Sequence, residues 1–446
     1  MTSPVKIFSS FMEGAPQLTN AFGCMTAVLD AVLVNGFNIK SVTSITRAAD
    51  IATVTIAAGH GYKQNQTVTI SGAAEADYNG EFKILSAGPT TFTYTVAGTP
   101  ATPATGTISC KASSLGWEIA FTGTNKRAYR SLNPLSNKPY LRVDDGQDPV
   151  WTGTYAKKAK VTMAQQMTGI DTFQGTYAPF DPQTPTKGEV GTGSGATAYD
   201  GWFKWYYARQ GGSNMPDSGA PAAGNRPWFI VGDDRGFYLF NDSMDASGAN
   251  VGGLGGKCFT DFVSYRAADG FNTILCAQDA YVNATLTPAS WPMSSVSGGS
   301  GSDGYAGSDQ VAQFPRLGST AGKLVLRAYT QFGAAQSVSF AGLKTYTTDA
   351  LPMVSGYRTG INFPNGPDYS LVLHPVLIKE GNNLRGHMPG IMWIYNDVST
   401  VLVHGDLLTN VNGYPGRTFQ VIGVAHGEAA TNYKAFMAVD ITGPWW

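Results

Sequence analysis

Residues 16–37 read PQLTNAFGCMTAVLDAVLVNGF and contain the only long helical pattern in the sequence. Apolar side chains recur there at three- and four-residue spacings, as on one face of a helix: Leu18, Phe22, Met25, Val28, Leu29, Val32 and Leu33. Pro16 suits a helix entrance, Thr19 or Asn20 could cap it, and Gly36 is placed to end it in a left-handed turn. Because this face is wide, we expect the helix to be buried as a plug in a large β structure.

The composition favours a β protein. Glycine accounts for 54 of 446 residues, aromatic residues for 12% and charged residues for only 14%, against roughly 25% charged residues in average globular proteins. Such a composition is typical of many short strands joined by tight turns. We predict a mainly β fold, built from β-sandwich and β-sheet domains with one N-terminal helix. A surface poor in charge also favours association with other subunits.

Charge and cysteine content narrow the class of protein. The net charge of −1 provides no global attraction to nucleic acid or to an anionic membrane. The four cysteines have no CxxC spacing and are expected to be reduced and mostly buried: Cys24, Cys110, Cys258 and Cys276. The N-terminal residues lack the pattern of a signal peptide, and no apolar run is long enough to span a membrane. We expect a protein that is made in a cytoplasm and is soluble or assembles there.

The pattern changes at residue 41 to short alternating strands, such as TVTI at 53–56 and FTYTV at 92–96. Turn residues separate these runs, as in Gly59-His60-Gly61. Six or seven strands in about seventy residues is the size of a small Ig-like sandwich. We predict an inserted Ig-like domain at residues 41–110, which splits a parent β domain into residues 1–40 and 111–292.

Strand patterns also fill most of the remaining chain. Residues 228–231 and 237–240 flank a Gly-Asp-Asp-Arg-Gly turn and predict a hairpin. Residues 293–320 pass through a stretch rich in glycine and serine, which predicts a loop or linker. We predict a C-terminal β domain at residues 321–446.

Several of these segments resemble proteins of tailed bacteriophages. The residues around Gly61-Tyr62, VTISG at 68–72, YNGEF at 78–82, FTY at 92–94 and ATGT at 104–107 resemble an Ig-like module frequent in phage tail and virion proteins. Four further segments are similar to a family of phage virion proteins that has no assigned active site: residues 116–131, 138–145, 385–391 and 416–421. The resemblance implies a structural component of the virion, with the Ig-like module as an accessory insertion.

Two pairs of acids are candidate catalytic residues. Asp144-Asp145 and Asp233-Asp234 could supply the two carboxylates of a glycosidase. Neighbouring strand residues point to opposite faces, however, and both pairs lie beside glycine in turn-like contexts. Turn formation is therefore the preferred interpretation. Asp148 could share a Ca²⁺ ion with the first pair, but the spacing fits no standard loop.

The remaining motifs also favour structural explanations. Residues 252–258, GGLGGKC, resemble a phosphate-binding loop, but Val251 and Cys258 occupy positions that require other residues, so we predict a flexible turn. The dispersed histidines form no zinc pattern: His60, His374, His387, His404 and His426. Ser194 and Ser300 lie in Gly/Ser loops without the context of a nucleophile elbow. We expect no catalytic residue, metal or cofactor, and a protein that is not an enzyme.

Aromatic residues are the best candidates for contact with a partner. Residues 202–209, WFKWYYAR, predict a strand buried on both faces. The alternative is a platform of Trp202, Trp205 and Tyr206 that stacks on sugars or bases. Trp445 and Trp446 should dock on this chain or on a neighbour, because leaving them in water is costly.

These observations predict a bacteriophage virion structural protein of the tail, baseplate or fibre, which mediates assembly and contacts the host surface. We expect it in the virion after assembly in the host bacterial cytoplasm. Its expected partners are other virion proteins and copies of itself in a homo-oligomer, with a host-surface glycan as a further candidate, and neither nucleic acid nor membrane insertion. The alternatives are a capsid decoration or head-fibre protein, and a tail protein that binds or depolymerises host polysaccharide.

Overall fold

The computed structural model describes residues 4–147, 153–180, 191–192, 199–200, 203–210, 219–242, 255–279, 323–341, 371, 373–394, 402–425 and 434–446. The predicted fold class is confirmed: the chain is mainly β, with one helical segment near the N-terminus and antiparallel sheets throughout the described residues. Among those residues, no helix is long and apolar enough to cross a membrane.

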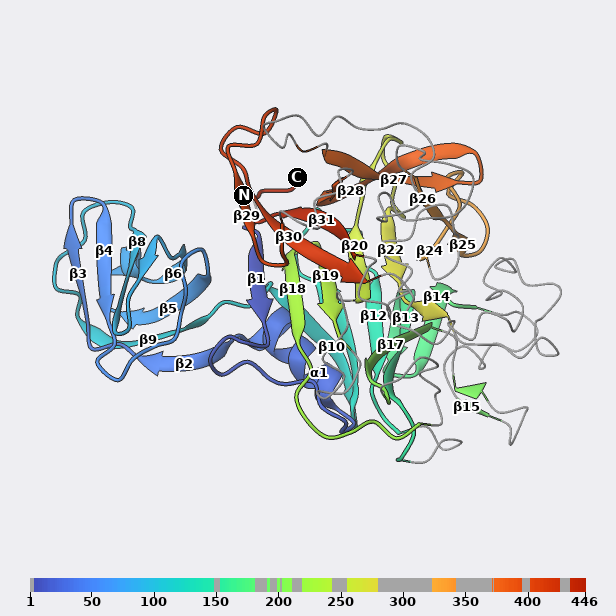
Figure 1. The fold of residues 1–446 in the computed structure, drawn as a ribbon, viewed down its shortest axis with the longest axis horizontal. Helices are drawn as coiled ribbons and strands as arrows, with labels where there is room; N and C mark the ends of the chain where they lie inside the picture. Colours follow the sequence, from blue (N-terminus) through green and yellow to red (C-terminus); the bar gives the residue numbers. More distant parts are fainter. Residues whose placement is uncertain are drawn as a thin grey trace.

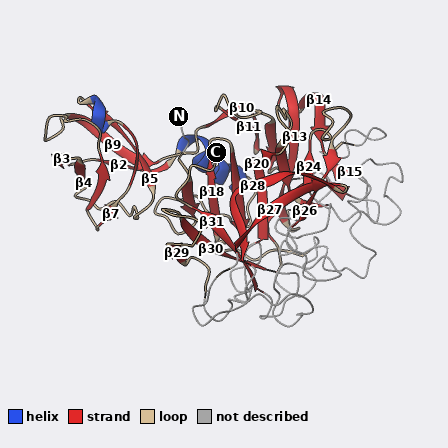
Figure 2. Cartoon of the chain, turned by 90° about the horizontal axis from the view of Figure 1, so that it is seen from above, coloured by secondary structure: helices blue, strands red, loops and turns tan. Residues whose placement is uncertain are grey.

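Eight strands form a sandwich of two four-stranded sheets beside the main body (Figures 1 and 2). One sheet has the order β2 (Phe37–Ser41), β9 (Gly106–Ala112), β5 (Thr67–Ala73) and β6 (Gly80–Lys83). The other has the order β3 (Ser44–Ala48), β4 (Ile51–Thr55), β8 (Thr91–Thr95) and β7 (Ser86–Ala87), and a short turn, η2 (Ala76–Tyr78), precedes β6. Within the described residues these strands pair only with one another.

The body has a central sheet whose two faces are covered by other sheets. The central sheet has the order β1 (Lys6–Ser9), β18 (Trp228–Asp233), β19 (Gly236–Asn241), β20 (Gly255–Asp261), β22 (Thr273–Cys276), β24 (Lys323–Val325) and β25 (Gln336–Ser337). The predicted hairpin at 228–240 is confirmed, since β18 and β19 pair from Trp228↔Asn241 to Asp233↔Gly236. Every residue of both strands is buried, which explains their continuous apolar runs.

One face of the central sheet packs against a layer that we call the β10 sheet. Its order is β10 (Trp117–Gly123), β11 (Lys126–Ser131), β12 (Tyr140–Asp144), β13 (Lys157–Gly169), β17 (Phe203–Ala208) and β23 (Gln278–Asp279), with β14 (Thr172–Ala178) also paired to β13. The ring of Trp117 lies 5.8 Å from that of Phe237 between the two layers. A separate two-stranded ribbon joins β15 (Gly191–Thr192) and β16 (Tyr199–Asp200).

The other face of the central sheet packs against a layer that we call the β28 sheet. Its order is β26 (Ser339–Ala341), β27 (Leu373–Glu380), β28 (Asn383–Ile394), β31 (Lys434–Asp440), β30 (Thr418–Ala425) and β29 (Leu407–Thr409), with β21 (Val263–Ser264) paired to β28. The Tyr238 hydroxyl, from the central sheet, donates to the carbonyl of Pro389 at 2.6 Å. The predicted boundary at residue 321 falls inside this body, because β24 pairs with β22 in the central sheet.

The helix is shorter than the apolar pattern predicts. It comprises α1 (Cys24–Leu29) and a π-helical continuation, η1 (Asp30–Asn35). The expected start at residue 16 is wrong: Leu18 instead pairs with Arg226, and Gly23 has a φ of 87°. Neither Thr19 nor Asn20 caps the helix, because its first residue is Cys24. The helix ends at Gly36, as predicted, and the Gly36 amide donates to the Ala31 carbonyl at 2.8 Å. The φ of 70° is positive as expected, but the ψ of 178° differs from that of a left-handed turn.

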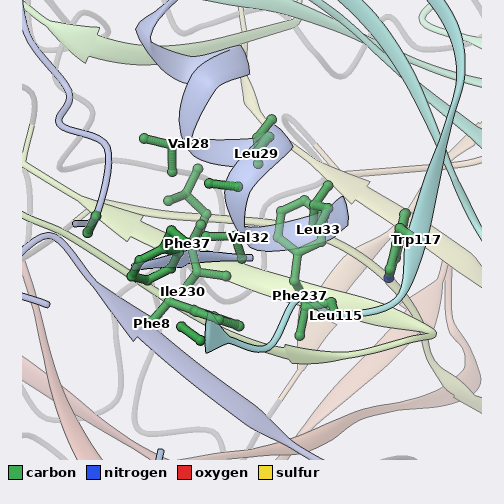
Figure 3. Packing of buried hydrophobic residues seen from close by; sticks show 14 of the residues in the cluster. Phe8, Val28, Leu29, Val32, Leu33, Phe37, Leu115, Trp117, Ile230 and Phe237 are labelled. Atoms are coloured by element: carbon green, nitrogen blue, oxygen red, sulfur yellow. The ribbon is translucent and has the colours of Figure 1, made fainter. Parts of the chain in front are cut away.

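The apolar face of the helix points into the core between the central sheet and the start of the β10 sheet (Figure 3). Figure 3 shows Val28, Leu29, Val32 and Leu33 among residues of several strands and connections: Phe8, Phe37, Leu115, Trp117, Ile230 and Phe237. The predicted burial of this face is therefore confirmed. Phe22 lies outside the helix, with the Lys157 ammonium 5.0 Å from its ring centre.

Two lysines attach the sandwich to the body. The Lys6 ammonium lies 2.7 Å from the Glu81 carboxylate, and the Lys83 ammonium donates to the Ile441 carbonyl at 3.1 Å. The sandwich begins and ends at one place, because Phe37 is the strand partner of Ala112. The strands of the sandwich span residues 37–112, whereas the predicted insertion spans residues 41–110. That the sandwich is an independent domain stays a prediction.

Replacing residues 41–110 by a short glycine-serine bridge should leave the body folded. Lys40 pairs with Cys110, so the cut ends are neighbours and a short bridge can join them. Phe37, whose ring lies 6.1 Å from that of Phe8, is kept. A cooperative thermal transition with strand-type circular dichroism is the expected measurement. A chain without cooperative unfolding would contradict the insertion.

Candidate functional site

The proposed aromatic platform is not exposed at the two described residues. Trp205 is 0% exposed; its ring lies 6.0 Å from that of Phe237, and its indole N–H donates to the Cys276 carbonyl at 2.9 Å. Trp205 therefore joins the β10 sheet to the central sheet. The interpretation of residues 203–208 as a strand buried on both faces is confirmed, and the expectation of an exposed contact is corrected. Trp202 lies outside the described residues.

Tyr206 points to the opposite face of β17 from Trp205 and is 2% exposed. Three cations lie near its ring: the Arg209 guanidinium at 3.9 Å, the Lys158 ammonium at 5.4 Å and the Lys204 ammonium at 5.9 Å. Cations are attracted to the negative face of an aromatic ring. Lys204 on β17 and Arg209 just after it are close to Tyr206 in sequence, whereas Lys158 on β13 reaches the ring because it is the strand partner of Tyr206. The aromatic pattern of this segment alone did not indicate these cations.

The two C-terminal tryptophans dock on this chain, as expected. The Trp445 indole N–H donates to the Asp440 carbonyl at 2.9 Å, and a Cβ at Gly390 would lie only 2.1 Å from that nitrogen. The Trp446 indole N–H donates to the Asp233 carboxylate at 2.8 Å, and the Arg235 guanidinium lies 3.7 Å from the ring centre of Trp446. Both side chains are half-buried. Trp446 covers the turn of the central hairpin, and the ring of Trp445 lies 5.5 Å from that of Tyr238.

Asp233 and Asp234 form the turn between β18 and β19, as predicted. The Asp233 carboxylate accepts the amides of Arg235 at 2.8 Å and Gly236 at 3.1 Å. The Asp234 carboxylate accepts the side-chain amide of Asn133 at 2.8 Å. Each carboxylate therefore has its own structural partners.

Asp144 and Asp145 point in opposite directions, as expected for neighbouring strand residues. The Asp144 carboxylate lies 3.3 Å from Arg142, 3.5 Å from Lys126 and 3.6 Å from Lys160 on the outer face of the β10 sheet. The Asp145 carboxylate points inward to the start of the helix. The two groups thus do not share one site, and Asp148 lies outside the described residues.

Asp145 caps the helix from a distant part of the chain. Its carboxylate accepts the amides of Met25 at 2.8 Å and Thr26 at 3.3 Å, and the Tyr207 hydroxyl at 2.5 Å. These partners satisfy amides that a helix leaves free at its N-terminus. No local sequence signal identifies this cap, because Asp145 and Met25 are 120 positions apart.

A second acid, Asp30, fixes the helix to β11. Its carboxylate accepts the Tyr129 hydroxyl at 2.7 Å and the Arg127 guanidinium at 3.1 Å. The acids around the helix therefore orient it between the layers.

Burial raises the pKa values of two acids, Asp145 and Asp233. Removal from water raises the pKa of Asp145 to about 7, although Tyr207 and the helix amides favour its charged form. Burial likewise raises the pKa of Asp233 to about 7, against the opposing effect of the Arg235 amide. Perturbed acids often mark active sites. Here both are held in hydrogen bonds that define a helix start and a turn.

These shifts predict a pH dependence of stability. The pKa of Asp145 is higher in the folded protein than in the unfolded chain, so the group stabilises the fold while it is protonated. This contribution is fully present at a pH below the pKa of the unfolded chain, and it is lost as the pH rises through the folded pKa of about 7. Wild type should therefore lose stability from pH 5 to pH 8, whereas Asp145→Asn has no carboxyl group to titrate. The difference in free energy of unfolding between the two proteins should shift in favour of the variant by on the order of 2 kcal/mol over this range. Urea unfolding of both proteins at each pH measures this difference. Parallel stability profiles would contradict the raised pKa.

Of the glycine-rich motif at 252–258, the structure describes residues 255–258, and these form a strand and not a turn. Residues 255–258 belong to β20, where Gly255 pairs with Asn241 and Gly256 with Phe240. The Lys257 ammonium donates to the Asn241 side chain at 2.6 Å. The prediction of a flexible turn is wrong for these residues, because the motif supplies a strand of the central sheet.

The described histidines are dispersed over the sandwich and the β28 sheet. Burial lowers the pKa of His60, His387 and His404. His374 lies on β27, and the remaining histidine, His426, is outside the described residues, as are Ser194 and Ser300. In the part of the chain that the structure describes, no three His, Cys, Asp or Glu side chains gather as metal ligands would.

No protein-family profile and no curated protein sequence matches the chain. By its structure the chain is an antiparallel β protein with a body of three sheets and a sandwich attached at one side (Figure 1).

Proposed function

We propose that the chain is a structural protein of a tailed-bacteriophage virion, placed with the tail, baseplate or fibre attachment. The proposal rests on a resemblance to phage virion segments, which covers short motifs within residues 61–107 and residues 116–131, 138–145, 385–391 and 416–421. Residues 116–145 supply β10, β11 and β12, which also hold the helix through Tyr129 and Arg127. The similarity thus falls on strands that build the body and not on a surface loop alone.

The use of the candidate chemical groups supports an assembly role. Asp145 and Asp233 serve a helix start and a turn, and Trp205 lies in the core. An assembly protein draws its binding energy from apolar and aromatic surface buried between subunits. Large apolar side chains are exposed on the described surface, including Phe11 at 86%, Phe332 at 78% and Leu135 at 70%.

The proposed partners are other virion proteins and further copies of this chain. Symmetric particles place such components in rings or trimers around an axis, so we propose a homo-oligomer. The attached sandwich projects to one side of the body (Figure 1), which suits a module that contacts a neighbouring subunit or the host surface. A host-surface glycan is retained as a further partner.

The copy number in particles tests this proposal. Phage particles purified by sedimentation and washed in high salt should retain the chain at a fixed ratio to the main tail protein. Quantitative mass spectrometry measures that ratio. A chain found only in the soluble lysate would contradict a virion role.

The proposal also predicts that the purified protein releases no reducing sugar from host polysaccharide. The reason is that the described carboxylates of each acid pair are separated and engaged in the fold. A reducing-sugar assay on host capsule or lipopolysaccharide checks this. Activity that disappears in Asp144→Asn or Asp233→Asn would establish a depolymerase instead.

A further inference from the structure

Two of the four cysteines face each other in the central sheet. Cys258 in β20 is the direct strand partner of Cys276 in β22. Both are free thiols, and both are 0% exposed. Their side chains lie in the same apolar cluster, between the central sheet and the β28 sheet.

The register brings the two thiols opposite each other at the Cα spacing of a disulfide bond. Just beyond the paired segment, the Phe262 amide donates to the Asn272 carbonyl at 2.7 Å. Hydrogen-bonded and non-bonded pairs alternate along an antiparallel ladder, so the pair four residues earlier, Cys258 and Cys276, is also hydrogen-bonded. The Cα atoms of such a pair are about 5.5 Å apart, within the roughly 4.4–6.8 Å that disulfides span between Cα atoms. The Cβ atoms of a hydrogen-bonded pair are about 5.5 Å apart, and a disulfide requires roughly 3.5–4.5 Å, so the two strands must move closer together locally for the bond to form.

The other two cysteines lack this arrangement. Cys24 contacts the Thr19 hydroxyl at 3.0 Å at the start of the helix. Cys110 lies in the sandwich, where its strand partners are Lys40 and Ile70. Only one pair in the chain therefore has opposed thiols on neighbouring strands.

We propose that Cys258 and Cys276 form a latent cross-strand disulfide site, which stays reduced in the cytoplasm and closes under a two-electron oxidant. Each thiol loses one hydrogen and one S–S bond forms. With diamide as the oxidant, the two electrons and two protons reduce its N=N bond to a hydrazine. The proposal concerns the sheet itself and does not depend on the virion role.

Burial controls how the site reacts. The thiolate is the reactive form of cysteine, and burial together with the neighbouring Cys276 raises the pKa of the Cys258 thiol. Oxidation should therefore be slow in the closed fold and faster when the sheet opens locally. Once formed, the bond joins β20 to β22 and restricts the unfolded chain, which raises the unfolding midpoint.

Diamide treatment of the full chain tests the site. The reduced protein is incubated with diamide, in buffer and in urea below the unfolding transition, then unfolded and treated with iodoacetamide. Intact mass should show two alkyl groups instead of four in the urea sample, and peptide mapping should show the Cys258–Cys276 link. Dithiothreitol should restore four thiols, and the oxidised protein should melt a few degrees higher than the reduced one.

Serine variants provide matched controls. Cys258→Ser and Cys276→Ser should each keep all three remaining thiols and show no change in midpoint with diamide. The double variant Cys24→Ser with Cys110→Ser should still lose both of its thiols. Four alkylated cysteines in both samples would overturn the proposal, as would links through Cys24 or Cys110 or between chains.

Discussion

Asp145→Ala should lower the free energy of unfolding by about 3 kcal/mol, one of the two largest single effects that we expect. The substitution leaves the amides of Met25 and Thr26 without their acceptor. It also removes the shorter of the two contacts of the Tyr207 hydroxyl, whose other acceptor is the Ala21 carbonyl at 3.1 Å. All of these groups lie in the interior, where an unpaired donor costs about 1–3 kcal/mol. Loss of the cap should also loosen the helix that fills the core beside the central sheet. Urea unfolding followed by tryptophan fluorescence measures the change.

Two further variants separate the cap from a general effect of removing charge. Asp145→Asn keeps an acceptor oxygen and should lose much less stability than the alanine variant. Asp50→Ala removes an exposed carboxylate and should change the free energy of unfolding by less than about 0.5 kcal/mol. Equal stability of Asp145→Ala and wild type would show that the helix does not depend on this cap.

Trp205→Ala should lower the free energy of unfolding by about 3–5 kcal/mol, because it opens a large cavity between the β10 sheet and the central sheet. The side chain is 0% exposed, and its indole N–H is bonded to Cys276. Trp205→Phe should recover part of the loss by restoring apolar contact with Phe237. Thermal and urea unfolding of the three proteins provide the measurement.

The same variant decides between a core residue and a sugar-binding residue. Leu135→Ala, at a side chain that is 70% exposed, is the matched surface control and should be close to wild type in stability. A Trp205→Ala protein with wild-type stability that had lost only glycan binding would reverse our assignment.

The strands of the central hairpin could be predicted from sequence because their information is local. Continuous apolar runs flank a turn whose Asp233 accepts the Arg235 amide two residues on. The end of the helix could also be predicted from a local signal, because glycine adopts the positive φ found at Gly36 at little steric cost. Turn and end signals of this kind depend on few neighbours.

The start of the helix could not be predicted, because its determinants lie far away in the chain. The apolar spacing continues back to Leu18, but Leu18 pairs with Arg226 and the cap comes from Asp145. For the same reason Lys158 could not be placed beside Tyr206 from sequence, because the two residues meet through the pairing of β13 with β17. It predicted that Trp446 would dock, but could not identify Asp233 as its partner.

The central claim is that this chain is a component of the phage tail, and a labelled image of the particle tests it most directly. Purified particles are incubated with a gold-labelled antibody against the chain and viewed by electron microscopy. We predict gold at one fixed position on the tail, repeated in register with the tail's symmetry. Gold on the heads would establish a capsid decoration protein, and particles without gold would contradict the virion role.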